Sequence, residues 1–338
     1  MSAPSPAWRA AGAFGWRPRS IRRQHRGHIH DSFVVTDPSG RFLLQRVNRA
    51  VFPDPVALSA NLAAARRVLG AGVVPTPVAD PDGACTVEVA GGTWRAFVLV
   101  EGSAAPPHPT PTALRSAGGL LGRFHAGLAA LDAGAVVEVL PRFHDLGRRL
   151  CELRAAVERD EAHRAAAAGP DIDRALADAP LAAAVDGLAA TLPRRVAHND
   201  AKLDNLIFRR GRAVCLIDLD TLMPGHWFWD VGDLLRSASS TAAEDTTAPA
   251  EVSVDPRRYA AVLEGYRHAM TGVTLDAAEL DALEVAGAAA TYEQALRFLT
   301  DWLAGDRYYR TARPDHNRDR ARSQLALLGA MPRPPWAP

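Results

Sequence analysis

Residues 196–233 read VAHNDAKLDNLIFRRGRAVCLIDLDTLMPGHWFWDVGD, a stretch in which two apolar runs are bordered by acids and amides. The runs LIF and AVCLI predict two antiparallel strands, and Gly211 as the first residue of a two-residue type II′ turn would place Asn205 opposite Asp218. Directly opposed side chains have Cβ atoms roughly 4.5–5.5 Å apart, close enough for an amide oxygen and a carboxylate to share one divalent ion. The spacing therefore predicts a magnesium site at the open end of this hairpin.

Asp200 lies on the loop that enters the first of these strands, five residues before Asn205. The letters HND at 198–200, followed by Asn205, match the catalytic loop H-R-D-x-x-x-x-N of kinases. In that loop the aspartate accepts the proton of the substrate hydroxyl and the asparagine binds metal. The pattern indicates phosphoryl transfer to a hydroxyl group, with Asp200 as the base.

Asp218 stands where kinases carry the metal-binding aspartate of their D-F-G motif, but Leu219 and Asp220 follow it in place of Phe and Gly. This departure excludes an ordinary protein kinase. Buried charge without a partner is costly, so acids beside apolar strands call for a cation. The alternative is that these acids cap loop backbone, as Asp and Asn often do at turns. Asp204 is the acid that we expect to be merely solvated.

The composition fits a globular protein of two lobes. The chain has 338 residues, whereas one domain usually has roughly 100 to 200. Hydrophobic residues make up 48% and charged residues 23%, which argues against disorder. A net charge of +1 produces no overall field that would favour nucleic acid or an anionic membrane. We therefore expect a small-molecule partner and neither of those.

Residues 1–102 predict a small β-rich lobe with one helix, after an irregular start up to about residue 20. Short alternating or apolar runs between turn residues indicate strands. The predicted strands cover 32–36, 41–47, 85–89 and 94–100. Between the second and third of them, Asp54 as N-cap and Pro55 in the first turn open a helix that ends before Gly70.

Residues 103–338 predict a larger, mainly helical lobe, entered through the stiff proline-rich stretch AAPPHPTPT. Helical periods recur along it. The predicted helices cover 114–131, 146–157, an alanine-rich stretch to about 192, 259–270 and 277–303. The small polar residues of 237–256 predict a mobile loop. The expected fold class is α+β, in the bilobal arrangement of protein-kinase-like folds.

The cysteines and the apolar runs indicate the cellular compartment of the protein. Cys85, Cys151 and Cys215 are scattered and odd in number, which favours reduced, buried thiols over a disulfide or metal framework. The first twenty residues hold no apolar core with a small-residue cleavage site, and no apolar run reaches membrane length. We therefore expect a cytoplasmic protein.

Three residues are candidates for nucleotide binding. Lys202 is the only lysine of the chain, which favours a specific role for a compact ammonium group inside the densest motif. Gly27 opens a turn that could cover phosphates, although a lone glycine is a weaker signal than a glycine-rich loop. Arg46 occupies the strand position where protein kinases carry lysine, and a guanidinium can hold phosphate oxygens.

With these motifs the chain resembles the aminoglycoside phosphotransferase and choline kinase superfamily, and more closely its N-acetylhexosamine 1-kinase branch. HND with IDLDT is typical of the superfamily, whereas QRVN, FHD and RFLTDWL point to the sugar-kinase branch. Matching segments run from about residue 27 to about residue 325. The resemblance implies ATP and Mg²⁺ as cofactors and phosphorylation of the anomeric hydroxyl of an N-acetylhexosamine.

The resemblance also implies roles for individual residues. Asp200 would be the base, Asn205 and Asp218 the metal ligands, and Asp220 with Thr221 a contact to substrate or metal. These roles would place the chemistry of both the metal and the acceptor in one segment of the chain.

Arg297 and Tyr308 resemble sugar contacts of that branch. They are eleven residues apart, about three helical turns, so they meet only if the chain bends near Gly305, a plausible helix end. The alternative is an exposed arginine and a half-buried tyrosine without a shared role.

The resemblance further implies a hinge between the lobes at the end of the last predicted strand, where main-chain groups near Glu101 would recognise adenine. One departure from protein kinases is that the helix beginning at Pro55 contains no glutamate, and no lysine exists to pair with one. Phosphate anchoring would then rely on Arg46 and the metal.

Three other functions remain open from the residues. An aminoglycoside or amino-alcohol acceptor would need acidic or aromatic surroundings, which HWFWDVGD at 226–233 offers, although such aromatics more often form core packing. A catalytically inactive binding protein could keep the fold, but the intact Asp200, Asn205 and Asp218 argue against it. A zinc hydrolase is weaker still, because no H-E-x-x-H spacing occurs.

Overall fold

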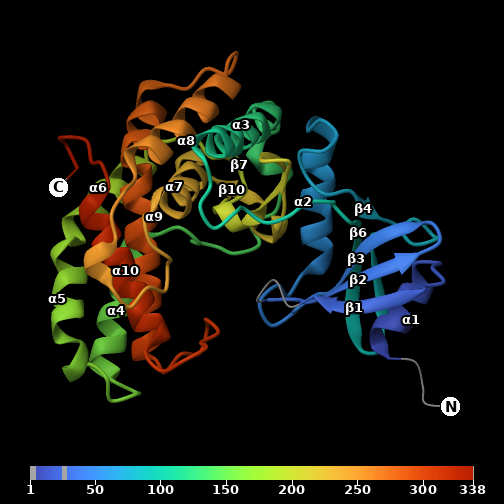
Figure 1. Ribbon diagram of the computed structural model, residues 1–338, viewed down its shortest axis with the longest axis horizontal. Coiled ribbons are helices and arrows are strands. Elements are labelled where there is room, and N and C mark those ends of the chain that lie inside the picture. The colour runs from blue at the N-terminus through green and yellow to red at the C-terminus, as the bar shows by residue number, and fades with distance from the viewer. Residues whose placement is uncertain (1–4, 25–28, 338) are drawn as a thin grey trace.

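The computed structural model describes residues 5–24 and 29–337, so the predicted phosphate-covering residue Gly27 lies outside the described residues. Figure 1 shows two lobes, a sheet with helices beside it on the right and a larger, mainly helical lobe on the left. This arrangement confirms the expected α+β, bilobal fold.

The smaller lobe is built on an antiparallel sheet. Its strands are β1 (Ser20–Gln24), β2 (Asp31–Asp37), β3 (Gly40–Arg46), β4 (Pro77–Val78), β5 (Thr86–Val89) and β6 (Gly92–Val98). The strand order is β1-β2-β3-β6-β4, and β5 also pairs with β6. The predicted strands 32–36 and 41–47 form an antiparallel hairpin, in which Asp37 pairs with Gly40 across a two-residue turn.

The start of the chain is helical, so the irregular segment predicted up to about residue 20 is wrong. The helix α1 (Pro6–Ala13) buries three alanines against the sheet. The turn after it places Trp16 on Phe42 with ring centroids 4.2 Å apart. A face made only of alanines gives a weak apolar signal, which is why the sequence did not reveal this helix.

The helix α2 (Pro55–Val68) lies between the sheet and the larger lobe (Figure 1). As predicted, Asp54 caps it, since one carboxylate oxygen accepts hydrogen bonds from the N–H groups of Val56 (3.1 Å) and Ala57 (3.0 Å).

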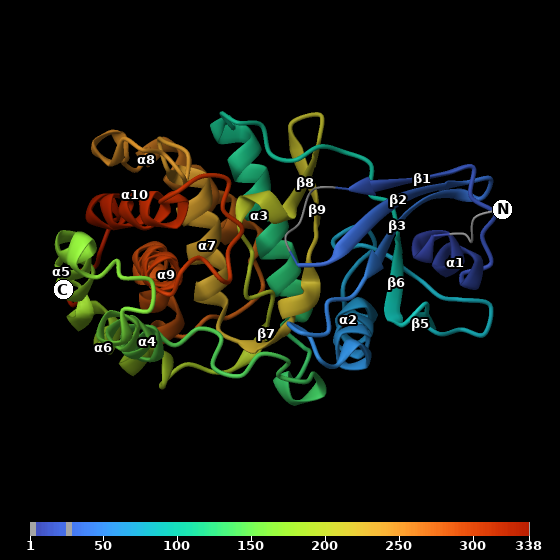
Figure 2. The same ribbon diagram turned by 90° about the horizontal axis from the view of Figure 1, so that it is seen from below.

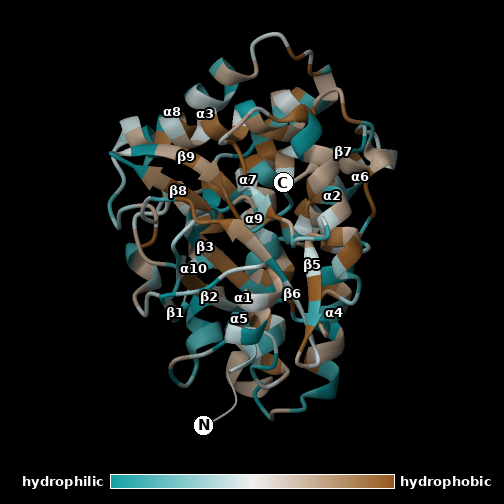
Figure 3. Cartoon of the chain, turned by 90° about the vertical axis from the view of Figure 1, so that its right-hand side faces the viewer, coloured by the Kyte–Doolittle hydropathy of each residue, from teal (hydrophilic) through white to brown (hydrophobic). Residues whose placement is uncertain are grey.

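The larger lobe holds the remaining elements. They are α3 (Pro111–Leu128), α4 (Leu146–Arg159), α5 (Gly169–Ala177), α6 (Ala179–Ala189), β7 (Arg195–Ala197), β8 (Leu206–Arg209), β9 (Arg212–Leu216), β10 (Met223–Gly225), α7 (Trp227–Ser239), α8 (Pro256–Ala269), α9 (Ala277–Leu303) and α10 (His316–Ala330). The hairpin β8–β9 lies beside α3 and faces the smaller lobe (Figure 2). Hydrophobic residues run along its strands, while hydrophilic ones gather at the periphery (Figure 3).

Two helices of this lobe were not predicted. The helix α7 starts in the aromatic run, and its Trp227, Phe228 and Trp229 are all buried, which confirms that these aromatics form core packing. The helix α10 starts in an arginine-rich segment whose cations hid its apolar period. Both helices pack on the long central helix α9.

The helices α3 and α8 cross at glycines that permit backbone contact. A Cβ added at Gly265 would lie 1.9 Å from the carbonyl oxygen of Arg115, and one added at Gly118 would lie 2.0 Å from that of Val262. No side chain fits at either position, so the two glycines set the distance between these helices.

Residues 237–256 are only partly the loop that was predicted. The helix α7 continues to Ser239, and Ser240 then forms a β-bridge with Val254. Glu244 forms an ion pair with Arg236, with Oε1 2.6 Å from Nη1. The two ends of the loop therefore lie side by side, and an ion pair connects the loop to the preceding helix.

The cysteines are free, but only one of them is buried as predicted. Burial raises the pKa of the Cys215 thiol to about 12. Cys85 is half-buried and Cys151 is exposed on α4, so the prediction of three buried thiols is wrong for Cys151. Among the described residues, no helix combines the length and apolar character needed to cross a membrane.

Candidate active site

The hairpin β8–β9 has a different register from the predicted one. Arg210 (φ 51°) and Gly211 (φ 74°) are its turn residues, and positive φ at both positions corresponds to a type I′ turn. A further register shift lies between Ile207 and Phe208. As a result the carbonyl of Asn205 accepts from the N–H of Ile217 (2.8 Å), so Asn205 lies opposite residue 217 and not 218. The predicted register is wrong.

The HND loop is held by a buried carboxylate that the sequence did not reveal. Asp230, at the start of α7, accepts hydrogen bonds from the backbone N–H groups of His198 (2.8 Å) and Asn199 (2.6 Å). His125 on α3 lies 2.8 Å from the same carboxylate. Burial alone would raise the pKa of Asp230, but His125 and His198 hold it below its usual range. The loop is thus fixed to two helices.

Asn199 takes a left-handed backbone conformation (φ 62°) that turns the chain into Asp200. Its side-chain amide donates to the carbonyls of Thr221 (2.9 Å), Ala197 (3.2 Å) and Met223 (3.3 Å). This network joins the HND loop to the segment after Asp218.

The predicted base Asp200 lies between two groups of its own loop. Lys202 Nζ lies 2.9 Å and 2.7 Å from the two carboxylate oxygens, and Asn205 Nδ2 donates to Oδ2 (2.9 Å) and to the backbone oxygen of Asp200 (2.7 Å). Burial would raise the pKa of Asp200, but the charge of Lys202 outweighs it and the pKa is lowered. The carboxylate is therefore ionised at neutral pH, as a proton acceptor must be.

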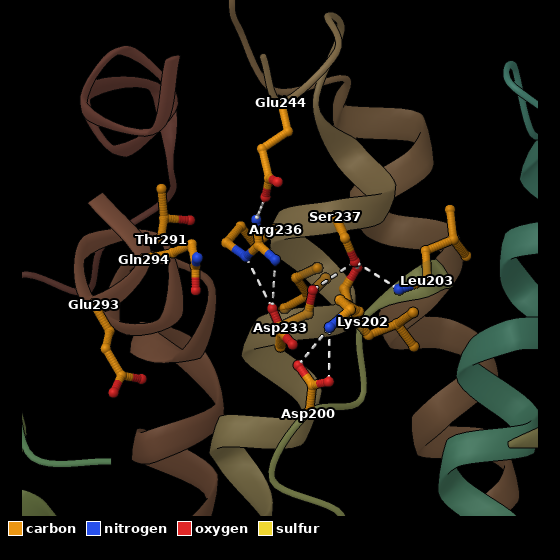
Figure 4. Close-up of polar contacts among 12 residues, drawn as sticks. Asp200, Lys202, Leu203, Asp233, Arg236, Ser237, Glu244, Thr291, Glu293 and Gln294 are labelled. Atoms are coloured by element: carbon orange, nitrogen blue, oxygen red, sulfur yellow. Dashed lines mark hydrogen bonds and ion pairs between the residues drawn. The ribbon is translucent and has the colours of Figure 1, made fainter. Parts of the chain in front are cut away.

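Lys202 is surrounded by acids from three segments. Burial would lower its pKa, but the charges of Asp200, Asp233 and Asp218 raise it above the ordinary value. Figure 4 shows Lys202 pointing at Asp200, with Asp233 and Arg236 of α7 beside it. Asp204, in contrast, is exposed, as predicted.

Asp218 has the features of a metal ligand. It is exposed between the lobes, has φ 64°, and its carboxylate makes no hydrogen bond or ion pair with the described part of the chain. Desolvation by the surrounding protein, together with the charges of Asp220 and Asp200, raises its pKa. A cation would relieve this repulsion.

The residues present fit Mg²⁺, which prefers a few protein oxygens completed by phosphates and water. Because Asn205 donates through Nδ2, its Oδ1 remains an acceptor that no described residue uses. No group of three His, Cys, Asp or Glu side chains within residues 5–24 and 29–337 is arranged as a metal site. The available donor set is therefore the amide oxygen of Asn205 and the carboxylate of Asp218.

Asp220 has partners that the sequence did not reveal. Arg95 Nη1 and Nη2 contact its two carboxylate oxygens, the second at 2.8 Å, and His30 Nε2 lies 2.6 Å from Oδ2. Arg95 and His30 together hold the pKa of Asp220 far below its usual range, although burial acts in the opposite direction. Both oxygens are occupied, which argues against the predicted roles of Asp220 as metal ligand and substrate contact.

Thr221 is likewise engaged within the protein. Its hydroxyl donates to the backbone oxygen of His198 (2.6 Å), and the residue is buried. The contact links the segment after Asp218 to the HND loop, whereas a substrate contact was predicted.

Arg46 does not face the site. Its side chain is exposed and lies against the β5–β6 turn, with Nη2 3.4 Å from the carbonyl oxygen of Gly91. Neighbouring side chains of a strand point to opposite faces, and here Gln45 and the opposed Arg95 take the inner one. The predicted phosphate anchor is therefore on the wrong face of the sheet.

Glu101 lies in the connection between the lobes. Its side chain is exposed and forms an ion pair with Arg41 (2.7 Å), and its backbone oxygen accepts from Arg209 of the β8–β9 hairpin (2.9 Å). The segment that was predicted to recognise adenine is thus tied to both lobes. The backbone oxygen of Glu101 itself is already engaged by Arg209.

Arg297 and Tyr308 come together as predicted. The helix α9 ends at Leu303, and Gly305 (φ 90°) turns the chain back. The guanidinium of Arg297 then lies 5.9 Å from the ring centre of Tyr308, and also near Tyr309 (5.6 Å) and Phe143 (5.4 Å). Tyr309, Glu293, Tyr308 and Asp200 raise the pKa of Arg297 against the effect of burial.

The FHD motif, which the sequence assigned to no role, lies behind the HND loop. His144 Nε2 is 3.0 Å from the backbone oxygen of Asn199, and Nδ1 is 2.6 Å from the carboxylate of Glu293 on α9. The imidazole stacks on Trp229 at 4.6 Å. Through this ring, the helix that carries Arg297 is connected to the residue before Asp200.

Among the residues that hold this site together, sequence reasoning missed Asp230, His144, Glu293, Arg95 and His30. The motifs DVGD and FHD contained a signal for Asp230 and His144. Arg95 and Glu293 gave none, because each becomes meaningful only beside a partner more than 120 residues away.

Comparison with known proteins agrees with this geometry. Residues 20–270 match the phosphotransferase enzyme family (APH), which is about three quarters of the 338 residues. Similar solved structures include a spectinomycin phosphotransferase, APH(9)-Ia, in complex with ADP and spectinomycin (11% identity, TM-score 0.60, covering 96% of this chain and 97% of that one).

An aminoglycoside phosphotransferase from Alicyclobacillus acidocaldarius subsp. acidocaldarius DSM 446 has 16% identity and a TM-score of 0.59, covering 98% of this chain and 96% of its own. A microcompartment-associated aminopropanol kinase has 18% identity and a TM-score of 0.55, covering 95% and 94%. At these identities the structures show a shared fold, whereas the sequence match shows kinship. The chain belongs to the phosphotransferase enzyme family, whose members are small-molecule kinases that typically use ATP with Mg²⁺.

Proposed function

We propose that this chain transfers the γ-phosphate of ATP to the anomeric hydroxyl of an N-acetylhexosamine or a related sugar. The observation that carries the proposal is the convergence of an ionised Asp200 with Lys202, Asn205 and Asp218, whose carboxylate has no partner among the described residues. These are the groups that phosphoryl transfer to a hydroxyl requires: a base, a cation and metal-binding oxygens.

In the proposed reaction, Asp200 accepts the proton of the acceptor hydroxyl while the oxygen of that hydroxyl bonds to the γ-phosphorus. The bond from that phosphorus to the β,γ-bridging oxygen breaks, and ADP leaves. Asn205 and Asp218 would hold Mg²⁺, which neutralises phosphate charge when bound. Lys202, the only lysine, would move from Asp200 to the transferring phosphate and leave the base free.

Nucleotide would bind between the lobes, with residues 1–102 forming the nucleotide-binding lobe and 103–338 the catalytic and acceptor lobe. Main-chain groups of the connection near Glu101 would meet adenine. Since Arg46 points away, the metal and Lys202 would carry the phosphate contacts in this lobe arrangement.

The acceptor would bind against Arg297. Its one side-chain hydrogen bond in the described chain is long, 3.5 Å to Gln294, so most of its five N–H donors are unused. Tyr308 is 58% exposed beside it and offers a ring face for a sugar. Donors next to an aromatic surface suit an uncharged polyhydroxyl acceptor with a carbonyl substituent.

The test is a panel of sugars, aminoglycosides and amino alcohols with ATP and Mg²⁺, followed by ³¹P and ¹³C NMR of the product. A 1-phosphate of an N-acetylhexosamine supports the proposal. Activity confined to other hydroxyls or other acceptors would overturn the sugar assignment but keep the kinase.

An aminoglycoside or amino-alcohol acceptor is the second candidate. It is favoured by the acids Asp233, near Lys202, and Glu244, beside Arg236, which would suit a cation, and by the similarity to an aminopropanol kinase. However, Arg236 lies between these acids and pairs with both (2.8 Å and 2.6 Å), so little acidic charge is left over. The same panel decides between the two acceptors.

A further inference from the structure

The two lobes are connected by a buried ionic cluster, which consists of Arg95, His30 and Asp220. Arg95 comes from β6 and His30 from the connection before β2, whereas Asp220 belongs to the larger lobe. The three side chains are 10%, 4% and 4% exposed. A buried charge requires a partner, so separating the lobes at this point would strand charge on both sides.

Contacts within the smaller lobe orient Arg95 toward Asp220. Gln45 on β3 accepts from Arg95 Nε (3.0 Å) and in turn donates to Ser32 Oγ on β2 (3.1 Å). The guanidinium also lies 5.3 Å from the ring centre of Phe97. Three strands thus orient the planar fork toward the Asp220 carboxylate.

His30 presents a defined donor to the same carboxylate. The backbone N–H of Asn48 donates to Nδ1 (3.0 Å), which leaves the proton of a neutral ring on Nε2, 2.6 Å from Asp220 Oδ2. Asp220 therefore receives hydrogen bonds from both partners, and all come from the smaller lobe.

Asp218 lies between two anchored positions. On one side, the N–H of Ile217 donates to Asn205 (2.8 Å) and its carbonyl lies 2.9 Å from His198 Nε2, and on the other side the cluster holds Asp220. Asp218 lies two residues before Asp220, in a left-handed conformation, and its side chain has no hydrogen-bond partner among the described residues. Asp218 is the N-cap of the short 3₁₀ turn Leu219–Thr221 that contains Asp220, so a displacement of Asp220 would move the backbone that carries Asp218.

We propose that Arg95 is a positioning residue that, through Asp220, sets the place of Asp218 when the lobes are closed. The inference rests on the proposed function, in which Asp218 is a ligand of the nucleotide-bound metal. The strand lysine of protein kinases binds the nucleotide phosphates directly, whereas Arg95 would act from the sheet through a carboxylate of the other lobe.

The test compares Arg95→Gln, Arg95→Lys, Asp220→Asn and the double variant Arg95→Gln/Asp220→Asn with a matched control. The control is Asp171→Asn, which removes another largely buried carboxylate held by two arginines, Arg318 (2.8 Å) and Arg322 (2.8 Å), within the larger lobe. Three readouts are taken: hydrogen exchange of residues 217–222 without ligand, calorimetric ATP affinity at rising Mg²⁺, and kcat.

For Arg95→Gln we expect faster exchange at 217–222, a higher Mg²⁺ requirement for tight ATP binding, unchanged metal-free ATP affinity, and kcat lower on the order of 10²-fold. Asp220→Asn should change the three readouts in the same way. The double variant should show no larger change than either single variant, because each substitution removes the same interaction. Arg95→Lys should retain only part of the wild-type kcat and Mg²⁺ response, since a lysine cannot bind a carboxylate bidentately. Asp171→Asn should change only stability.

The proposal is overturned if Arg95→Gln matches Asp171→Asn in all three readouts, or if the effects of Arg95→Gln and Asp220→Asn multiply. It is also overturned if metal-free ATP binding weakens as much as metal-bound binding, because Arg95 would then contact phosphate itself. If the wild-type protein phosphorylates no acceptor, the proposed function fails, but exchange and calorimetry still decide the role of Arg95.

Discussion

At the scale of the residue, Asp200 is the side chain on which we expect turnover to depend most. Its carboxylate is ionised and within 3 Å of Lys202 and Asn205. Replacement by Asn keeps the shape and removes the proton acceptor. We expect Asp200→Asn to lower kcat on the order of 10²- to 10⁴-fold, with ATP affinity within a factor of about three, measured by coupled assay and calorimetry. Wild-type turnover in this variant would show that another group is the base.

Asp218 is the residue at which the metal can be tested directly. Because desolvation and the charges of Asp220 and Asp200 raise its pKa, removing the charge of Asp218 should stabilise the ligand-free protein and abolish the extra stabilisation by Mg²⁺. We expect Asp218→Asn to keep or raise the melting temperature without ligand, while the extra stabilisation by MgATP over ATP alone disappears. A thermal-shift titration measures both, and an undiminished Mg²⁺ effect would exclude Asp218 as a ligand.

At the scale of the element, α9 is joined to the HND loop through His144 and Glu293. Burial raises the pKa of Glu293, but His144, Arg297 and Arg149 lower it to about 2. A carboxyl group with a lowered pKa stabilises the fold at pH values above its unfolded pKa, and this stability is lost as pH falls toward the folded pKa.

The expected contribution of Glu293 is on the order of 3 kcal/mol at neutral pH. We therefore expect the difference in unfolding free energy between wild type and Glu293→Gln to shrink as pH falls from about 5 toward 2. Urea unfolding at several pH values measures this difference. A difference that stays constant with pH would show that Glu293 acts through packing alone.

The crossing of α3 and α8 gives a prediction about packing. A methyl group at position 265 would overlap a carbonyl oxygen of the facing helix, so Gly265→Ala should lower the unfolding free energy by about 1–3 kcal/mol. Gly187 on α6 has no atom within 4 Å of such a methyl group, and Gly187→Ala should stabilise by roughly 0.5–1 kcal/mol. Equal effects in urea unfolding would contradict this reading of the crossing.

At the scale of the whole molecule, the interface between the lobes contains more than the Arg95 cluster. Asn61 on α2 donates to the carbonyls of Val137 and Leu222 (both 2.8 Å) and accepts from the N–H of Val137 (2.8 Å). The lobes are therefore closed by polar contacts with defined geometry, which a nucleotide between them would have to accommodate. If Asp218 binds metal as proposed, this polar closure would bring residues of the smaller lobe to bear on its position.

The extent to which the sequence predicted this protein differs between local and distant features. The hairpin β2–β3, the capped helix α2 and the helix α9 followed from local patterns, because turn residues, caps and apolar periods act over a few positions. The HND motif likewise predicted that Asp200 and Asn205 would lie together, since only five residues separate them. Family kinship followed from the same motifs.

Tertiary structure alone decided the partners of these residues. The face on which Arg46 lies and the register of β8–β9 depend on a single residue of strand alignment, which reverses every side chain that follows. The pairing of Asp220 with Arg95 spans 125 positions, and a charge finds such a partner only when packing has excluded water from both. Neighbouring residues determine short-range order, whereas the ionic contacts around the candidate site form only when the two lobes pack together.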